Sequence, residues 1–307
     1  MLTFRSRDGT ALDDILHPPG YRPRGLHFAL VFTELLARIH PLMLLPAWGA
    51  LTAIACWPWA NLRVPAAAMS AGFVVLDSVM LALLPRLGRS FGPVPPSLLA
   101  LTLVRACLTF GVGLVWGGRW ALAAVGLLQL TIVGVSMYAT WIEPFRLDVT
   151  HQDLPSPKLH SNTPVRLLHI SDLHVERITA REQQVLSLVE ELRPDLTVLT
   201  GDYLNLSSVR DPRSHAEVRE LLADICQRSQ GPVYAITGSP PVDLAGVVPE
   251  IFNGLSIIWL MDEVERVEVK GHRICIAGLQ CTRELSRDAP RLRRLLADLS
   301  PDAFILL

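Results

Sequence analysis

Two short runs in the second half of the chain have the residue types and spacing of a metal site. Asp172 and His174 stand two positions apart after the apolar stretch 165–170, and Asp202 follows a second apolar stretch, 196–199. Carboxylate oxygens and an imidazole nitrogen are ligands that divalent transition metals accept together. The three side chains therefore predict one cation site, provided that the two stretches lie side by side.

The elements around these residues predict that arrangement. Residues 179–192 carry apolar side chains at helical spacing, so the unit is strand, helix, strand. A right-handed crossover makes such strands parallel neighbours, with their carboxyl ends at one edge of the sheet. An extended backbone would point Asp172 and His174 the same way. Gly201 permits a tight turn before Asp202, whose two oxygens could bridge two cations about 3.5–4 Å apart.

The runs 172–174 (Asp-Leu-His) and 201–205 (Gly-Asp-Tyr-Leu-Asn) resemble the first two motifs of the calcineurin-like metallophosphoesterases, and the resemblance covers residues 165–307. It implies an α/β/β/α sandwich and two divalent ions, for which manganese, iron or zinc suits the ligands. By resemblance, Asp172, His174 and Asp202 hold metal and Asn205 supports the turn. The alternative is a metal-free α/β sheet whose strand-end acids cap helices.

The third motif of the family is broken in this chain. A third strand is expected at 232–237, and Ser239 then stands where the family has an asparagine that binds the second metal. Pro240 stands where the family has a proton-donating histidine, and proline carries no titratable group. Asp243 is the nearest candidate for a substitute ligand or acid, and the catalytic residue is otherwise unknown.

The family takes its remaining metal histidines from later strands. After Asp202 the chain has only His215, in a polar helical stretch, and His272, in an expected hairpin turn, and both are expected at the surface. The chain stops on the apolar stretch 303–307, which should be an interior strand. We therefore expect an incomplete sandwich that lacks the C-terminal part of the family domain and binds one metal or none. The alternative is that 303–307 forms a compact edge strand.

The first half of the chain predicts a membrane anchor of about four transmembrane helices within 41–142. Its apolar stretches carry no charge apart from Asp77 and Arg105, and about 20 apolar residues span a bilayer. The expected spans are 41–60, 64–85, 94–118 and 120–142. The alternative is a large buried helical core. Six tryptophans lie mostly near span ends, as interfacial anchors do: Trp48, Trp57, Trp59, Trp116, Trp120 and Trp141.

Asp77 and Arg105 allow two interpretations of the helices. Charges inside a membrane often mark a transport path, but they can also pair and hold a bundle together. One residue of each sign, in four helices without an internal repeat, favours the pair. A transport or sensing module remains the alternative.

Segments 1–40 and 143–164 flank the spans. The first is polar, with an amphipathic stretch at 25–40, and the second is a proline-containing linker to a domain at 165–307. With four spans, nine arginines and lysines fall on one side and two on the other, which places the domain in the cytoplasm at an inner or plasma membrane. Five scattered cysteines are expected to be reduced, as in that compartment.

The sequence therefore predicts an integral membrane protein with a metal-dependent phosphoesterase domain. Its substrate would be a phosphomonoester or phosphodiester, and membrane attachment suggests a lipid-linked one. Residues 143–307 carry 18 basic and 24 acidic side chains, so no nucleic-acid partner is suggested. The competing hypothesis is a non-catalytic membrane scaffold or binding protein that keeps the phosphoesterase fold.

Overall fold

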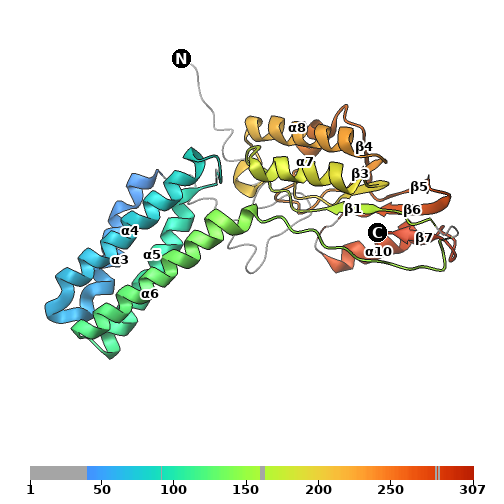
Figure 1. Ribbon diagram of the computed structural model, residues 1–307. Coiled ribbons are helices and arrows are strands. Elements are labelled where there is room, and N and C mark those ends of the chain that lie inside the picture. Colours follow the sequence, from blue (N-terminus) through green and yellow to red (C-terminus); the bar gives the residue numbers. More distant parts are fainter. Residues whose placement is uncertain (1–39, 91, 160–162, 281, 283) are drawn as a thin grey trace, which may run out of the picture. The chain divides into compact units, whose positions relative to one another are not determined.

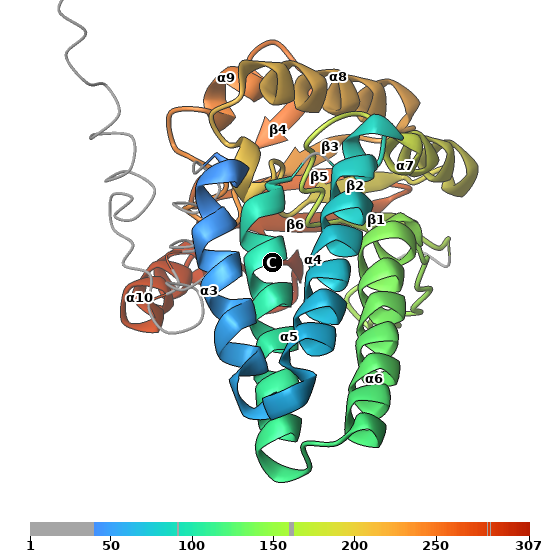
Figure 2. The same ribbon diagram turned by 90° about the vertical axis from the view of Figure 1, so that its left-hand side faces the viewer.

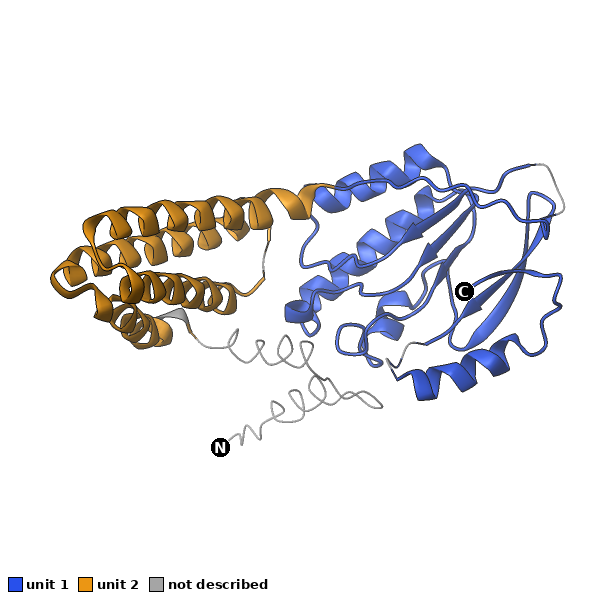
Figure 3. Cartoon of the chain, turned by 90° about the horizontal axis from the view of Figure 1, so that it is seen from below, with its two compact units in different colours: residues 1–31, 147–307 blue, residues 32–146 orange. Residues whose placement is uncertain are grey.

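The computed structural model describes residues 40–90, 92–159, 163–280, 282 and 284–307. Of these, residues 40–146 fall in one compact unit and residues 147–307 in another (Figure 3). The expected amphipathic stretch 25–40 lies outside the described residues, except for His40.

The first unit consists of helices. Its elements are η1 (Pro41–Leu44), α3 (Leu45–Cys56), η2 (Trp57–Leu62), α4 (Arg63–Arg86), α5 (Val94–Val115), α6 (Arg119–Met137), the π-helical turn η3 (Tyr138–Ile142) and η4 (Glu143–Phe145). Within η2, Ala60 has a φ of 43° and a ψ of −115°, which no helix contains. The chain reverses there, so α3 and α4 contact each other and run in opposite directions, and in the view of Figure 2 α5 appears between them.

Three helical stretches among the described residues are long and apolar enough to cross a membrane: Leu45–Arg86, Val94–Val115 and Arg119–Phe145. The first contains both α3 and α4. Helix α3 has 12 residues, or roughly 18 Å at 1.5 Å per residue, and needs its flanking turns to approach the hydrocarbon thickness. The count of four spans therefore stays a prediction, whereas the three long apolar helices are found.

Polarity in this unit is inverted relative to a water-soluble bundle. Val64, Val115 and Leu127 are 79%, 89% and 68% exposed, while Asp77 and Gln129 are fully buried. An apolar outside around a polar inside is stable where the surroundings are hydrocarbon rather than water. This inversion supports the membrane interpretation independently of helix length.

The buried charges form one closed network. Arg105 Nε and Nη2 donate to Asp77 Oδ2 and Oδ1 at 2.7 and 2.8 Å, a two-pronged pair between α4 and α5. Arg105 Nη1 donates to the side-chain oxygen of Gln129 on α6 at 2.6 Å, and Gln129 Nε2 donates to Thr109 Oγ1 at 3.1 Å. The guanidinium also lies over the Phe73 ring at 5.0 Å. The prediction that Asp77 and Arg105 pair is confirmed.

Trp59 corrects the prediction of interfacial tryptophans at one position. It is 1% exposed, and its indole N–H donates to the carbonyl of Thr109 at 3.0 Å. A Cβ on Gly113 would lie 2.6 Å from the indole nitrogen, so the glycine makes room for the ring. The reversal at Ala60 turns Trp59 inward, whereas Trp57, two positions earlier, is 69% exposed.

The second unit is an α/β domain with two sheets. The first has the order β1-β2-β3-β4, with all neighbours parallel: β1 (Leu167–Ile170), β2 (Leu196–Leu199), β3 (Val233–Ala235) and β4 (Ile257–Trp259). The second has the order β5-β6-β7: β5 (Glu263–Val269), β6 (His272–Gly278) and β7 (Phe304–Leu306). The other elements are α7 (Ala180–Leu192), η5 (Leu206–Ser208), α8 (Pro212–Arg228), α9 (Val248–Phe252) and α10 (Leu285–Leu296).

Two apolar cores hold these layers together. Leu186 and Val189 of α7 and Leu221 of α8 pack on one face of the first sheet. Leu196 and Tyr234 on its other face pack against the second sheet (Figure 1). The parallel pairing of β1 and β2 across the α7 crossover, expected from the sequence, is confirmed.

Helix α7 begins at a capping box. The Thr179 side chain accepts from the backbone of Arg181, and Glu182 accepts from the Thr179 N–H at 2.7 Å. The helix ends at Arg193, whose φ of 45° is left-handed. The start of α7 is thereby fixed close to the loop that follows β1.

The last strand differs from the expectation of an interior strand at 303–307. Helix α10 precedes it, and Arg291 within this helix contacts Asp262 and the Gln280 carbonyl. Strand β7 pairs in parallel with β6 at the edge of the described three-stranded sheet, and its side chains are half-buried.

The two histidines expected at the surface are not exposed. His272 is the first residue of β6 rather than part of the turn; it is 1% exposed, and its Nε2 donates to the Thr163 carbonyl at 2.7 Å. His272 pairs with Val269, so the His272 side chain faces the core. Lys270 and Gly271 make the turn between the two strands. His215 is half-buried, with Nε2 at 2.9 Å from the Val209 carbonyl.

Candidate metal centre

The loops that follow β1 and β2 remain paired beyond the ends of the strands. The Asp172 N–H donates to the Gly201 carbonyl at 3.2 Å, and the His174 N–H donates to the Asp202 carbonyl at 2.9 Å. An isolated parallel bridge between Val175 and Leu204 closes the ladder. This pairing keeps the side chains of the two loops at one edge of the sheet, as the sequence predicts.

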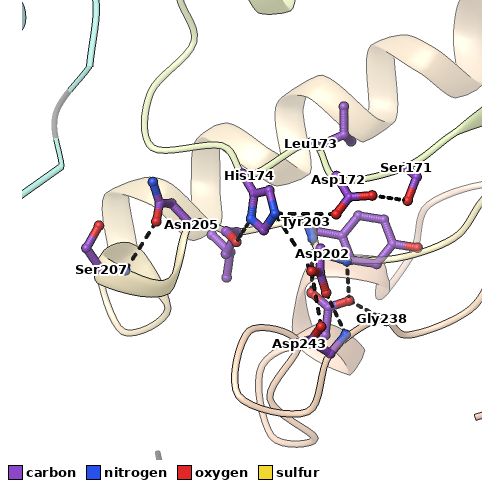
Figure 4. Close-up of polar contacts among 12 residues, drawn as sticks. Ser171, Asp172, Leu173, His174, Asp202, Tyr203, Asn205, Ser207, Gly238 and Asp243 are labelled. Carbon is purple, nitrogen blue, oxygen red and sulfur yellow. Dashed lines mark hydrogen bonds and ion pairs between the residues drawn. The ribbon is translucent and has the colours of Figure 1, made fainter. Parts of the chain in front are cut away.

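Asp172, His174 and Asp202 converge there. One ligand atom of each lies within 4.8 Å of the other two. His174 Nε2 is 3.5 Å from Asp172 Oδ1 and 3.7 Å from Asp202 Oδ2 (Figure 4). The side chains are 65%, 38% and 16% exposed in the order Asp172, His174, Asp202. The cluster therefore opens to solvent on the Asp172 side and is closed beneath Asp202.

The backbone at these residues is unusual. Asp172, His174 and Asp202 have φ values of 55°, 42° and 55°, in the left-handed region. A non-glycine residue there costs about 1–3 kcal/mol, and such strain concentrates at functional sites. The expectation of an extended backbone from Asp172 to His174 is wrong in this respect. Alternate left-handed residues, rather than an extended strand, aim both side chains at Asp202.

His174 is oriented by its other ring nitrogen. Nδ1 lies 3.2 Å from the Leu204 carbonyl, which can only accept, so Nδ1 carries the proton. In the neutral imidazole, the form that binds a metal, Nε2 then has the lone pair, and it faces the two carboxylates. A backbone carbonyl behind the imidazole is the arrangement that fixes the tautomer of a metal-binding histidine.

The donor set fits a divalent cation. It supplies two carboxylates and one neutral imidazole, and the partly exposed face leaves room for water or substrate oxygen. Without a cation the two carboxylates would repel each other across the histidine. A bound cation would remove this repulsion, so the arrangement favours metal binding.

The comparison with protein families agrees with this geometry. The model of the calcineurin-like phosphoesterase family matches residues 165–239, the stretch from just before β1 to just after β3. This part of the chain belongs to the calcineurin-like phosphoesterase family. No curated protein matches the chain.

The phosphoesterase match ends at the broken third motif, where Ser239 contacts Asp202 twice. The Ser239 N–H donates to Asp202 Oδ1 at 2.5 Å, and its hydroxyl donates to Asp202 Oδ2 at 3.2 Å. The next residue, Pro240, offers neither a side-chain donor nor an acceptor. The structure thus brings Ser239 to the predicted metal ligands and gives Pro240 no polar part in the site.

Asp243 lies under the Asp202 turn rather than among the ligands. It is 4% exposed, and its carboxylate accepts from the N–H groups of Asp202, Tyr203 and Gly238 at 2.7–3.0 Å. Burial raises the pKa of Asp243 to about 6, against the lowering effect of those donors. Because both oxygens are used in holding the turn, the contacts favour a positioning role over the hypothesis of a substitute ligand or acid.

Asn205 supports the second motif through its side chain. Its amide donates to Glu176 Oε1 at 2.5 Å, and its side-chain oxygen lies 3.5 Å from the Ser207 N–H at the start of η5. Glu176 follows the first motif, so this contact ties the two ligand-bearing loops together. Nothing in the local sequence pattern singles out Glu176, because its partner lies 29 positions away.

Two glycines allow the second and third loops to touch. A Cβ on Gly201 would lie 2.0 Å from the Gly238 nitrogen, and one on Gly238 would lie 2.4 Å from Asp202 Oδ1. Tyr203 closes the same region from below, donating its hydroxyl to the Ile236 carbonyl at 2.7 Å. The sequence analysis did not identify Asp243 and Tyr203 as supports of the site. The signal that could have revealed them is a glycine after each of two neighbouring strands, Gly201 and Gly238, which indicates that the two loops approach closely.

Proposed function

We propose that the chain is a membrane-anchored, metal-dependent phosphoesterase that hydrolyses a phosphomonoester or phosphodiester. The observation that carries this proposal is the convergence of Asp172, His174 and Asp202, with His174 Nε2 directed at both carboxylates. A divalent ion at these residues, with manganese, iron or zinc as candidates, would supply Lewis acidity toward a phosphoryl oxygen.

The residues of the chain divide the remaining tasks. Asp172 and His174 would hold the ion on the open side, from which substrate would approach, and the Leu204 carbonyl keeps a proton on His174 Nδ1. Asp202 binds from below and is fixed by Ser239 and by the Asp243-supported turn. Because Asp172 is 65% exposed, the site can admit a substrate much larger than the phosphoryl group.

The membrane helices support a substrate that reaches the domain from the bilayer, and we propose a lipid-linked phosphoester. The charge distribution around the expected spans supports a cytoplasmic domain at an inner or plasma membrane.

The test is hydrolysis by the full chain in detergent or nanodiscs with Mn²⁺, using bis-p-nitrophenyl phosphate and a phospholipid presented in mixed micelles. Asp172→Asn should abolish turnover of both, and Asp298→Asn, a change of an exposed residue in the turn after α10, should leave it intact. Turnover that survives in Asp172→Asn would exclude this site. Turnover of the soluble diester alone would exclude the lipid-linked substrate.

A non-catalytic scaffold is the second candidate, and one observation favours it. Pro240 occupies the position from which the family supplies a proton donor, and among the described residues His174, a predicted metal ligand, is the ionisable side chain that contacts the Asp202 carboxylate. Such a protein would bind metal through Asp172, His174 and Asp202 without hydrolysing any phosphoester. Metal binding together with undetectable turnover would favour this function.

A further inference from the structure

Asp202 determines how many metal ions the site can hold. It comes from the second strand end, and each oxygen of its carboxylate could face a cation. The number of ions therefore depends on whether both oxygens are open.

The two oxygens of Asp202 have different surroundings. Oδ2 faces the cluster, 3.7 Å from His174 Nε2, and accepts the Ser239 hydroxyl at 3.2 Å, a donor that can rotate away. Oδ1 accepts the N–H of Ser239 at 2.5 Å. The backbone of Gly238 lies so close that a Cβ built there would be 2.4 Å from Oδ1. A cation beside Oδ1 would have to displace main chain rather than a flexible side chain.

The main chain at Gly238 and Ser239 is itself fixed. The Gly238 N–H donates to Asp243 Oδ2 at 2.7 Å, and the same carboxylate oxygen accepts from the Asp202 N–H at 2.8 Å. One buried carboxylate thus binds both sides of the contact. The backbones at Gly201 and Gly238 are so close that not even a Cβ would fit between the two loops.

We infer that this chain holds a single cation, bound by Asp172, His174 and Oδ2 of Asp202, because backbone from the third strand end covers Oδ1. The inference rests on the proposed function and specifies it. A single divalent ion held there would balance the charge of the two carboxylates, and the exposed Asp172 side is where a phosphoryl group would approach it.

The experiment counts the manganese ions whose binding requires the intact ligands of the site. The full chain in nanodiscs is stripped with a chelator, dialysed against Mn²⁺, and its bound metal is measured beside Asp202→Asn and Asp172→Asn. Ions bound elsewhere remain in both variants, so the difference from wild type counts ions at the site. Electron paramagnetic resonance of the same samples separates an isolated Mn²⁺, with six hyperfine lines, from an exchange-coupled pair.

We expect a difference of one ion per chain and an isolated-ion spectrum. A difference of two ions with a coupled spectrum would overturn the single-cation inference and leave the proposed metal-dependent function standing. A difference of zero would overturn both. Asp172→Asn changes an exposed side chain, so agreement between it and Asp202→Asn excludes misfolding as the cause.

Ser239→Asn tests the reason for the single ion. The variant keeps the backbone N–H that occupies Oδ1 while restoring an amide ligand, so the difference should remain one. A gain of a second, coupled ion would overturn the backbone explanation and assign the limit to the side chain of Ser239.

Discussion

Each unit of this protein contains a cluster of charged residues, and the two clusters are built in opposite ways. In the helical unit, both Asp77 oxygens accept from Arg105, and Gln129 takes the remaining guanidinium edge. In the α/β domain, two carboxylates meet around a histidine with no basic side chain bonded to them in the described part of the chain. The first cluster is buried and neutral, and the second is partly exposed and negative.

The difference shows how to distinguish structural from functional charges. A buried ion pair with every donor matched has nothing left to offer a ligand, and breaking it costs more than making it gains. Converging carboxylates that have no arginine or lysine between them cost stability unless a metal ion joins them. The left-handed backbone at Asp172, His174 and Asp202 adds to that cost. We therefore expect the first cluster to govern stability and the second to govern metal binding.

The largest effect on stability should come from Arg105→Met. It leaves the Asp77 carboxylate buried without a partner, which we expect to cost about 3–5 kcal/mol of unfolding free energy. Adding Asp77→Leu should recover most of that loss, because the pair is then removed as a unit. Unfolding by sodium dodecyl sulfate in mixed micelles measures both. Arg119→Met, at an exposed helix end, is the control. Equal losses of stability in the two arginine variants would contradict a stabilising role of the Arg105–Asp77 ion pair.

Asp172→Asn should have the opposite effects, a large loss of metal affinity and little change in the stability of the metal-free protein. We expect Mn²⁺ affinity to fall about 100-fold, or ~2.7 kcal/mol. The stability of the metal-free protein should change by less than about 0.5 kcal/mol, because the side chain is 65% exposed. Isothermal titration and thermal unfolding with a chelator present measure the two quantities. A large loss of metal-free stability would show that the metal cluster also has a structural role.

Gly113→Ala probes the packing that closes the membrane network. Its new Cβ would lie 2.6 Å from the Trp59 indole nitrogen, and overpacking of this kind costs about 1–3 kcal/mol. Gly111→Ala is a matched control on the same helix, because no atom lies within 4 Å of the added carbon. A loss of stability in Gly111→Ala as large as in Gly113→Ala would mean that helix backbone, and not the contact with Trp59, is responsible.

The smallest effect is expected from Asn205→Ala, which removes the bond to Glu176 without touching a ligand. Contacts that orient ligands contribute about 10-fold or more to metal affinity, and we expect the lower end because Asp243 still holds the neighbouring turn. Asn253→Ala, in an exposed position after α9, is the control. Unchanged Mn²⁺ affinity in Asn205→Ala would restrict Asn205 to capping η5.

Much of the α/β domain could be predicted because its signals are local. Strand β2 was expected at 196–199 and spans Leu196–Leu199, and the helix expected at 179–192 begins at a capping box on Thr179. Apolar runs and caps are read within a few residues, so periodicity suffices for them. The parallel pairing of β1 and β2 follows from the crossover rule with no knowledge of contacts.

The supports of the site could not be predicted in that way. Asp243 was identified from its nearness in sequence to the broken motif, but its contacts with Asp202 and Tyr203 span 40 or more positions. The same holds for His272, which was expected in the hairpin turn. It is the first residue of β6, and its pairing with Val269 directs its side chain inward. Helical periodicity likewise gave no sign of the inward turn of Trp59 at Ala60.

Residue types and local patterns were enough to identify the chemical groups and the elements that carry them. These are the carboxylate and imidazole ligands after two strands, the paired charges in apolar helices, and the loss of the third motif at Ser239 and Pro240. Which of those groups have a bonding partner follows from the three-dimensional fold alone. Whether a carboxylate is neutralised, fixed or open depends on atoms brought to it from other elements, as Arg105 is brought to Asp77 and Ser239 to Asp202. Hydrogen bonds act over about 3 Å of space, whatever the separation along the chain.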